Sequence, residues 1–120
     1  MNKKTLVLGA SSNPVRYSYM AVRKLKFSQV PVVAVGLREG EIHGVLIEKP
    51  FPKYTDIHTV TIYVGPKNLP VFYDYILELN PRRVIFNPGT ESPAFEKTLS
   101  DRGIEVVRGC TLIMISSETY

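Results

Sequence analysis

The stretch that decides the fold of this chain runs from Thr5 to Pro14, with the sequence TLVLGASSNP. It begins as a short apolar run and ends in small, turn-forming residues, after which a helical pattern starts. This order predicts a strand, a tight loop and the beginning of a helix. In an open parallel sheet, free main-chain N–H groups meet the positive end of a helix dipole at such a loop. The stretch therefore predicts a seat for a phosphate group.

The loop itself has residues suited to that seat. Gly9 lets the main chain turn and approach a ligand closely, because it carries no Cβ. Ser11, Ser12 and Asn13 add side-chain donors and are favourable N-cap residues. The dinucleotide fingerprint G-x-G-x-x-G has further glycines that this loop lacks, so a strand-to-helix turn that binds nothing is the alternative. The candidate binding residues of the loop are Gly9, Ala10, Ser11, Ser12, Asn13 and Pro14.

The length and composition indicate a single domain over residues 1–120. The 44% hydrophobic content is ordinary for a globular protein. No apolar stretch approaches the roughly 20 residues that cross a bilayer. The apolar run after Lys3 and Lys4 is also too short for a signal peptide. We therefore expect a cytoplasmic protein with no membrane partner.

The net charge of +4 comes from basic residues scattered along the chain. Aromatic and basic residues do not interleave as they do on a nucleic-acid face, so we expect no nucleic-acid partner. A mild positive balance suits a small polyanionic ligand. The single cysteine, Cys110, argues against an internal disulfide and a thiolate metal site. We expect it to be a small buried hydrophobic residue.

Short apolar runs alternate with segments of helical periodicity along the chain. The Gly- and Pro-rich segment 36–58 predicts a crossover loop, with at most a short extended piece at Val45–Ile47. The apolar segment Cys110–Ile115 is expected to form a short strand or turn, and residues 116–120 are expected to fray. The predicted strands are 5–8, 31–35, 59–64, 83–87 and 104–107, and the predicted helices are 15–29, 66–79 and 93–102, followed by Gly103 as a C′ residue.

This alternation predicts an α/β domain. We expect a Rossmann-like, doubly wound, mainly parallel five-stranded sheet in the order 3-2-1-4-5, with helices on both faces. The order reverses between the first and fourth strands, so the crevice at that point is the expected ligand site.

Loops that leave the carboxyl ends of the predicted strands each have a glycine at or next to their start. Glycine often serves turn geometry alone, but several such loops around one crevice favour close approach of a ligand to the main chain. These loops are Gly9–Pro14, Gly36–Gly40, Gly65–Asn68 and Pro88–Glu91.

The loop after the second strand distinguishes between ligands. NAD-binding folds place an acidic residue at this strand end to hold the ribose hydroxyls. The sequence here is Val35-Gly36-Leu37-Arg38, with no acid before Glu39. Arginine suits a ribose phosphate, which NADP carries on the 2′ oxygen and coenzyme A (CoA) on the 3′ oxygen. NAD is therefore disfavoured, and a solvated loop charge is the alternative role for Arg38.

No residue is predicted to be catalytic. His43 and His58 lie in the irregular crossover, without a carboxylate at a partner spacing, and a surface or packing role is favoured for both. The sequence has no G-x-S-x-G, H-E-x-x-H or Walker lysine motif. Glu91 lies in a crevice loop, but the first turn of the following helix would also favour an acid there. A role other than catalysis is therefore favoured.

The run Gly9-Ala10-Ser11, followed by Asn13-Pro14, Arg16 and Ser18-Tyr19, resembles the opening of small bacterial and archaeal CoA-binding proteins. These are stand-alone versions of the N-terminal CoA-binding domain of the succinyl-CoA synthetase alpha subunit. Farther along, Asn87-Pro88-Gly89 is similar to the Gln-Pro-Gly of the family, and Cys110 matches its cysteine near the C-terminus. The resemblance covers nearly the whole chain.

The resemblance implies a role for each crevice loop. Residues 9–13 and Arg16 would surround the pyrophosphate of CoA, and residues 35–38 would border the adenosine. Gly65, Pro66 and Asn68 would line the far wall. Gly36-Leu37 stands where the family has Asn-Pro, and Arg38 replaces a lysine. The predicted ligand-binding residues are Gly9, Ala10, Ser11, Ser12, Asn13, Pro14, Arg16, Val35, Gly36, Leu37, Arg38, Gly65, Pro66, Asn68, Pro88 and Gly89.

Three functions remain open at this level. The favoured one is a non-catalytic or accessory module that binds CoA or an acyl-CoA, with room for a partner subunit. A small NADP- or nucleotide-dependent enzyme that uses the same crevice is the leading alternative. A structural subunit that has lost its ligand is the third.

Overall fold

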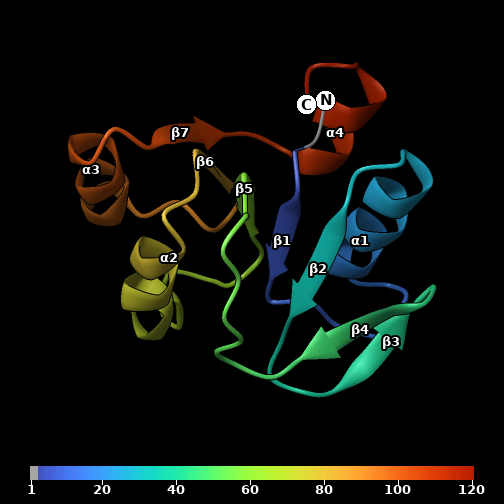
Figure 1. The fold of residues 1–120 in the computed structure, drawn as a ribbon. Helices are drawn as coiled ribbons and strands as arrows, with labels where there is room; N and C mark the ends of the chain where they lie inside the picture. The colour runs from blue at the N-terminus through green and yellow to red at the C-terminus, as the bar shows by residue number, and fades with distance from the viewer. Residues whose placement is uncertain (1–2) are drawn as a thin grey trace.

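The computed structural model describes residues 3–120 as a sheet between two layers of helices (Figure 1). Helices α1 and α4 cover one face, and α2 and α3 cover the other. The strands are β1 Thr5–Leu8, β2 Val32–Val35, β3 Gly40–Ile42, β4 Val45–Glu48, β5 Thr59–Ile62, β6 Arg83–Phe86 and β7 Glu105–Arg108. The helices are α1 Tyr17–Phe27, α2 Tyr73–Leu79, α3 Pro93–Asp101 and α4 Thr111–Ser116, and a 3-10 turn, Leu69–Phe72, precedes α2. Within residues 3–120, none of these helices is long and apolar enough to span a membrane.

The sheet has seven strands in the order β3-β4-β2-β1-β5-β6-β7. Neighbouring strands run parallel, except that β3 pairs antiparallel with β4 at one edge. The prediction of an α/β domain with a mainly parallel sheet and helices is confirmed. The prediction of five strands in the order 3-2-1-4-5 is wrong, because the strand at 59–62 pairs with β1 and does not lie beyond β2.

The difference arises in the segment after β2, which the sequence analysis treated as a crossover loop with at most a short extended piece at Val45–Ile47; that piece occurs as β4, but the strand β3 before it was not predicted. Residues 40–48 form a hairpin, and β4 returns parallel to β2 with Ile47 opposite Ala34. Ile42 and Ile47 are buried, whereas Leu46 is 66% exposed. Such an alternation over only a few residues is too short to predict a strand reliably. Because β4 occupies the place beside β2, the next strand pairs with the free side of β1.

The helices predicted over 15–29 and 93–102 occur as α1 and α3, whereas the helix predicted over 66–79 begins as the 3-10 turn Leu69–Phe72 and is α-helical only over Tyr73–Leu79. Gly103 follows α3 with a φ of 79°, as a C′ glycine does. The C-terminal segment differs. The apolar run 110–115, predicted as a short strand or turn, forms helix α4. The side chain of Asn87 accepts the main-chain N–H of Thr111 at 2.9 Å and so anchors the first turn. A short apolar run alone does not distinguish a strand from a helix.

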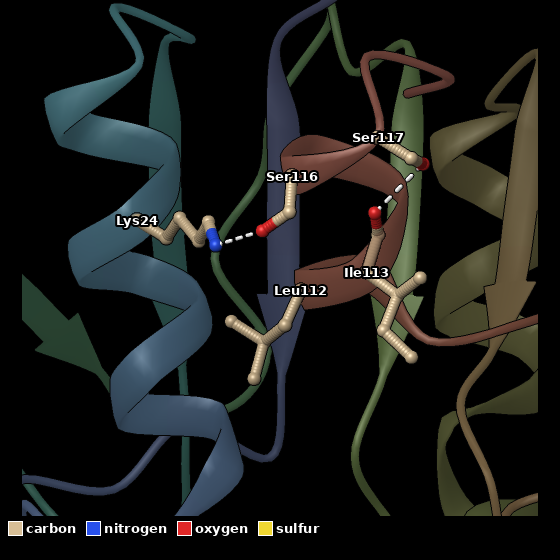
Figure 2. Close-up of a pocket in the computed structure, with 5 residues that line it drawn as sticks. All are labelled: Lys24, Leu112, Ile113, Ser116 and Ser117. Carbon is tan, nitrogen blue, oxygen red and sulfur yellow. Dashed lines mark hydrogen bonds between the residues drawn. The ribbon is translucent and has the colours of Figure 1, made fainter.

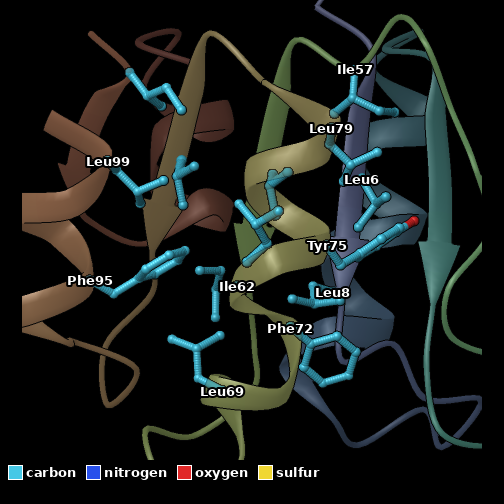
Figure 3. Packing of buried hydrophobic residues seen from close by; sticks show 14 of the residues in the cluster. Leu6, Leu8, Ile57, Ile62, Leu69, Phe72, Tyr75, Leu79, Phe95 and Leu99 are labelled. Atoms are coloured by element: carbon cyan, nitrogen blue, oxygen red, sulfur yellow. The ribbon is translucent and has the colours of Figure 1, made fainter. Parts of the chain in front are cut away.

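The larger core lies between the sheet and helices α2 and α3 (Figure 3). Leu6 and Leu8 of β1 point to this face, because side chains two residues apart share one face of a strand. Val7 points to the other face, where it packs with Val22 and Leu25 of α1. Strand β1 is thus covered on both faces, which explains its continuous apolar run.

Residues 116–119 are exposed, but Tyr120 packs against the amino end of the sheet, so the expected fraying of the last residue is wrong. The hydroxyl of Tyr120 is hydrogen-bonded to that of Thr5. Its ring covers Arg83, whose guanidinium carbon lies 4.4 Å from the ring centroid. Lys3 Nζ donates to the main-chain oxygen of Tyr120 at 2.6 Å. Residue 120 is therefore held by a set of specific contacts, which a pattern of polar residues does not reveal.

Candidate functional site at the carboxyl end of the sheet

The candidate site lies at the carboxyl end of the sheet, where the chain leaves β1 and β5 in opposite directions. From β1 the chain passes to β2 on one side, and β5 pairs with β1 on the other side. The topological switch point is therefore between β1 and β5, where open α/β sheets bind ligands. The sequence analysis placed it between β1 and the strand at 83–87, which was wrong because β5 separates these two strands.

The loop after β1 depends on Gly9 for the fold itself. Gly9 has a φ of 91°, a conformation that side chains disfavour. A Cβ there would lie 2.9 Å from Val64 Cγ2 and 3.0 Å from the carbonyl carbon of Tyr63. The N–H groups of Gly9 and Ala10 both donate to the main-chain oxygen of Val35 at 2.9 Å. Gly9 therefore brings three strand ends together, whether or not a ligand is bound.

Open main-chain donors follow Gly9. The hydroxyl of Ser11 accepts the N–H of Asn13 at 3.1 Å, and Asn13 Oδ1 accepts the N–H of Val15 at 3.2 Å. The N–H groups of Ser11 and Ser12 donate to no other residue within 3–120. The N-cap residue of α1, Arg16, makes no side-chain capping bond. The donors of the first helical turn therefore also remain open to an anion.

The loop after β2 divides into buried and exposed residues. Val35 and Gly36 are buried, and a Cβ on Gly36 would overlap the main-chain oxygen of Ala10. These two residues could contact a ligand only through their main-chain atoms. Leu37 is 77% exposed and Arg38 is also exposed, so both side chains are accessible at the carboxyl end of β2.

The loop after β5 faces solvent beside the β1 loop. Gly65, Pro66 and Asn68 are exposed, and the N–H of Asn68 donates to the main-chain oxygen of Gly65 at 3.0 Å. A Cβ on Gly65 would meet nothing within 4 Å. Lys67, which the sequence analysis did not single out, is exposed in the same loop. Its position within an expected crevice loop was the signal that could have identified it.

The loop after β6 lies one strand farther from the switch point. Pro88 and Gly89 are exposed, and the N–H of Gly89 donates to Glu91 Oε1 at 3.0 Å. Glu91 precedes α3 and closes this loop, so its expected place in the first helical turn was wrong. Asn87 is buried and donates to Thr61 Oγ1 at 2.7 Å, so it links the end of β6 to β5.

The charges around these loops favour an anionic ligand. Arg16, Arg38 and Lys67 are exposed at the carboxyl end of the sheet. No carboxylate within residues 3–120 forms an ion pair with any of them. Unpaired cations and open N–H donors are the groups that bind phosphate oxygens. The donors present therefore fit a pyrophosphate-bearing ligand.

The two histidines lie outside these loops. His43 is exposed at the turn between β3 and β4, and its ring centroid is 5.3 Å from that of Phe27. His58 precedes β5 at the amino end of the sheet, where Nδ1 lies 2.8 Å from Thr59 Oγ1. Burial, and then the charge of Arg83, lower the pKa of His58. Cys110 is free and half-buried, and no group of residues in the described part of the chain could hold a metal ion.

The topology places the chain among α/β proteins whose sheet has a topological switch point, the place where such sheets bind ligands. The chain matches the model of the CoA binding domain over residues 3–116. It therefore belongs to this CoA-binding domain family.

Solved structures with the same fold cover nearly the whole chain. An uncharacterized protein is 46% identical, with a TM-score of 0.97, and the match covers 100% of this chain and 99% of that one. The protein cell-free ID.343 from Thermus thermophilus is 25% identical, with a TM-score of 0.81 and coverage of 99% and 91%. A conserved hypothetical protein from Pyrococcus furiosus is 27% identical, with a TM-score of 0.75 and coverage of 97% and 99%. No curated protein matches the chain.

Proposed function

We propose that this protein binds CoA or an acyl-CoA at the carboxyl end of its sheet and acts as a non-catalytic or accessory module. The observation that carries the proposal is the group of open donors around the β1 loop. Within residues 3–120 these are the N–H groups of Ser11 and Ser12, the uncapped start of α1, and the unpaired side chain of Arg16. Membership of the CoA-binding domain family supports the same ligand.

The ligand would lie across the loops that follow β2, β1 and β5. Residues 9–14 and Arg16 would hold the pyrophosphate, and residues 35–38 would border the adenosine, with Val35 and Gly36 contributing main-chain atoms. Gly65, Pro66 and Asn68 would form the far wall, and Pro88 and Gly89 would lie at its outer margin. Without β3, the strands numbered along the chain have the order 3-2-1-4-5-6, which supports a Rossmann-like assignment.

The accessory role follows from the side chains around these loops. CoA supplies a thiol or a thioester, and the loops supply binding groups for its charged end. The predicted crevice loops contain two acidic residues, Glu39 and Glu91. The Oε1 of Glu91 already accepts the N–H of Gly89. Both histidines lie elsewhere. We further infer that the protein works in the cytoplasm and that a partner subunit, if there is one, supplies any chemistry.

Thermal unfolding with CoA, NADP and ATP tests the proposal. A ligand that binds only the folded protein raises the free energy of unfolding, by about 2.7 kcal/mol at a concentration of 100 Kd. We expect CoA at millimolar concentration to raise the melting temperature. Arg16→Ala should reduce this shift, whereas Arg82→Ala, which alters an exposed arginine at the amino end, should not.

The outcome separates the alternatives that the sequence left open. A shift with NADP and none with CoA would favour a small NADP-dependent enzyme. No shift with any of the three ligands would favour a structural subunit. If Arg16→Ala and Arg82→Ala reduce the CoA-induced rise in melting temperature equally, the general positive field, and not the β1 loop, attracts the ligand.

A further inference from the structure

Helices α1 and α4 form a groove on the face of the molecule opposite α2 and α3. Figure 2 shows Leu112 of α4 pointing toward α1, while Lys24 of α1 donates to the hydroxyl of Ser116. Two adjoining hollows share Lys24 and Leu112 as lining residues. We call this surface the α1–α4 groove and define it by Met20, Arg23, Lys24, Phe27, Leu112 and Ile113.

The groove has apolar side chains that remain open to solvent. Phe27 lines one of the two hollows and is 68% exposed, and Ile113 lines the other and is 67% exposed, while Leu112 lines both. Single exposed apolar residues are common on protein surfaces, but apolar residues gathered along two adjoining hollows are typical of a binding surface. The open side chains therefore provide the apolar half of a docking site.

The charges of the two helices are all positive. Helix α1 carries Arg23, Lys24 and Lys26, and neither α1 nor α4 contains an acidic residue. No carboxylate in the described part of the chain pairs with these three cations. By contrast, α2 contains Asp74 and Glu78 and no basic residue. The α1–α4 groove is therefore complementary to a partner that is both acidic and apolar.

We propose that the α1–α4 groove docks an acidic amphipathic helix of a partner protein. Apolar side chains spaced three and four apart on that helix would lie against Leu112, Phe27 and Ile113, as in other helix-in-groove contacts. Its carboxylates would face Arg23 and Lys24, which supplies the charge complementarity that selects and orients a partner. This inference concerns a different surface from the CoA site and does not depend on it.

Other occupants match these features less well. A second copy bound through the same face would place the positive patch of Arg23 and Lys24 against an identical positive patch, since a two-fold interface repeats one patch on both subunits. A lipid headgroup surface would attract the cations, but it presents no ridge to fill a groove between two helices. A helix provides both the ridge and the regular spacing of charges.

Fluorescence anisotropy with a labelled peptide tests the proposal. The probe is a helix-forming peptide of about 15 residues, with leucines three and four apart and glutamates at the other positions. We expect saturable binding to the intact protein and none by a control peptide with lysine in place of glutamate. Arg23→Glu should weaken binding roughly tenfold, because it reverses a charge at the groove. Lys97→Glu, on the exposed surface of α3, should leave binding unchanged.

A second pair of variants tests the apolar half of the groove. Ile113→Ser should weaken binding several-fold, whereas Val71→Ser on the other face should not, although both side chains are 67% exposed. The absence of saturable binding, or equal weakening by Arg23→Glu and Lys97→Glu, would overturn the proposal. If the peptide does not bind, two other results would also overturn the proposal: binding of phosphatidylserine vesicles, or dimerisation that Ile113→Ser abolishes.

Discussion

The carboxyl and amino ends of the sheet both collect positive charge, but they hold it in different ways. At the carboxyl end, Arg16, Arg38 and Lys67 are exposed and have no carboxylate partner within residues 3–120. At the amino end, Arg83 is 5% exposed, donates to Thr59 Oγ1 at 3.1 Å and lies under the ring of Tyr120. The three cations at the carboxyl end are accessible to a ligand, whereas Arg83 at the amino end is part of the packed interior.

The main-chain N–H groups at the two ends of the sheet also differ, because those of two residues at the amino end are hydrogen-bonded within residues 3–120 and those of two residues at the carboxyl end are open. The N–H groups of Arg82 and Arg83 at the amino end donate to the main-chain oxygen of His58. At the carboxyl end, the N–H groups of Ser11 and Ser12 donate to no described residue. Positive charge in the sequence is therefore a poor guide to an anion site. Donors that the fold leaves open are a better guide, because their hydrogen bonds are still available to a ligand.

The largest expected effect is that of Gly36→Ala at the carboxyl end. The new Cβ would overlap the main-chain oxygen of Ala10, and neither main chain can move without disturbing β1 or β2. We expect the free energy of unfolding to fall by about 3 kcal/mol, the upper range for overpacking. Urea unfolding measures this change in the free energy of unfolding. Gly65→Ala is the matched control, since a Cβ there meets nothing within 4 Å. Similar stability of the two variants would show that the two loops are not packed as described.

At the amino end, Tyr120→Ala should lower the free energy of unfolding by about 2 kcal/mol, because it removes a half-buried aromatic ring. It also removes the ring over Arg83 and the hydrogen bond with Thr5. Urea unfolding again gives the value, and the affinity for CoA should remain unchanged. Tyr17→Ala, at a side chain that is 70% exposed, should have little effect on stability. Loss of CoA affinity in Tyr120→Ala would contradict the separation of the two ends.

A specific test of the carboxyl end is Arg38→Ala. A guanidinium can donate two charge-assisted hydrogen bonds to the 3′-phosphate of CoA. On this exposed loop we expect a loss of about 1.5 kcal/mol, which is about a tenfold weaker affinity. Calorimetric titration should show little change for dephospho-CoA, which lacks that phosphate. Equal weakening toward both ligands would mean that Arg38 acts through the loop or the general field.

The smallest expected effect is the pH dependence due to His58 at the amino end. Its pKa is lowered in the folded protein, first by burial and then by Arg83, so the unfolded chain binds the proton more readily. The free energy of unfolding should therefore fall as the pH drops below the ordinary histidine value of about 6.5. Urea unfolding across this pH range should show a shallower dependence in His58→Gln. Parallel curves for the two proteins would assign the pH dependence to other groups.

The sequence predicted the positions of the glycine loops better than it predicted the sheet. The loops at Gly9, Gly36 and Gly65 were expected at the carboxyl ends of strands and lie there. Their adjacency was not predicted correctly, because it depends on which strand pairs with β1. That pairing was decided by a hairpin over residues 40–48, whose apolar alternation is only a few residues long. Helix α4 was missed for a related reason, since a short apolar run fits several structures and Asn87 anchors its first turn from another loop.

The sequence by itself determined the α/β class, the order of helices and strands outside the hairpin and α4, and the glycine loops at the strand ends. Each of these depends on residues that are near neighbours along the chain, so local patterns carry the information. Only the tertiary structure decided that β5 lies beside β1, that Gly36 makes room for Ala10, and that Tyr120 covers Arg83. These features join residues far apart in sequence, and they follow from which packing buries the most apolar surface and satisfies the most hydrogen bonds.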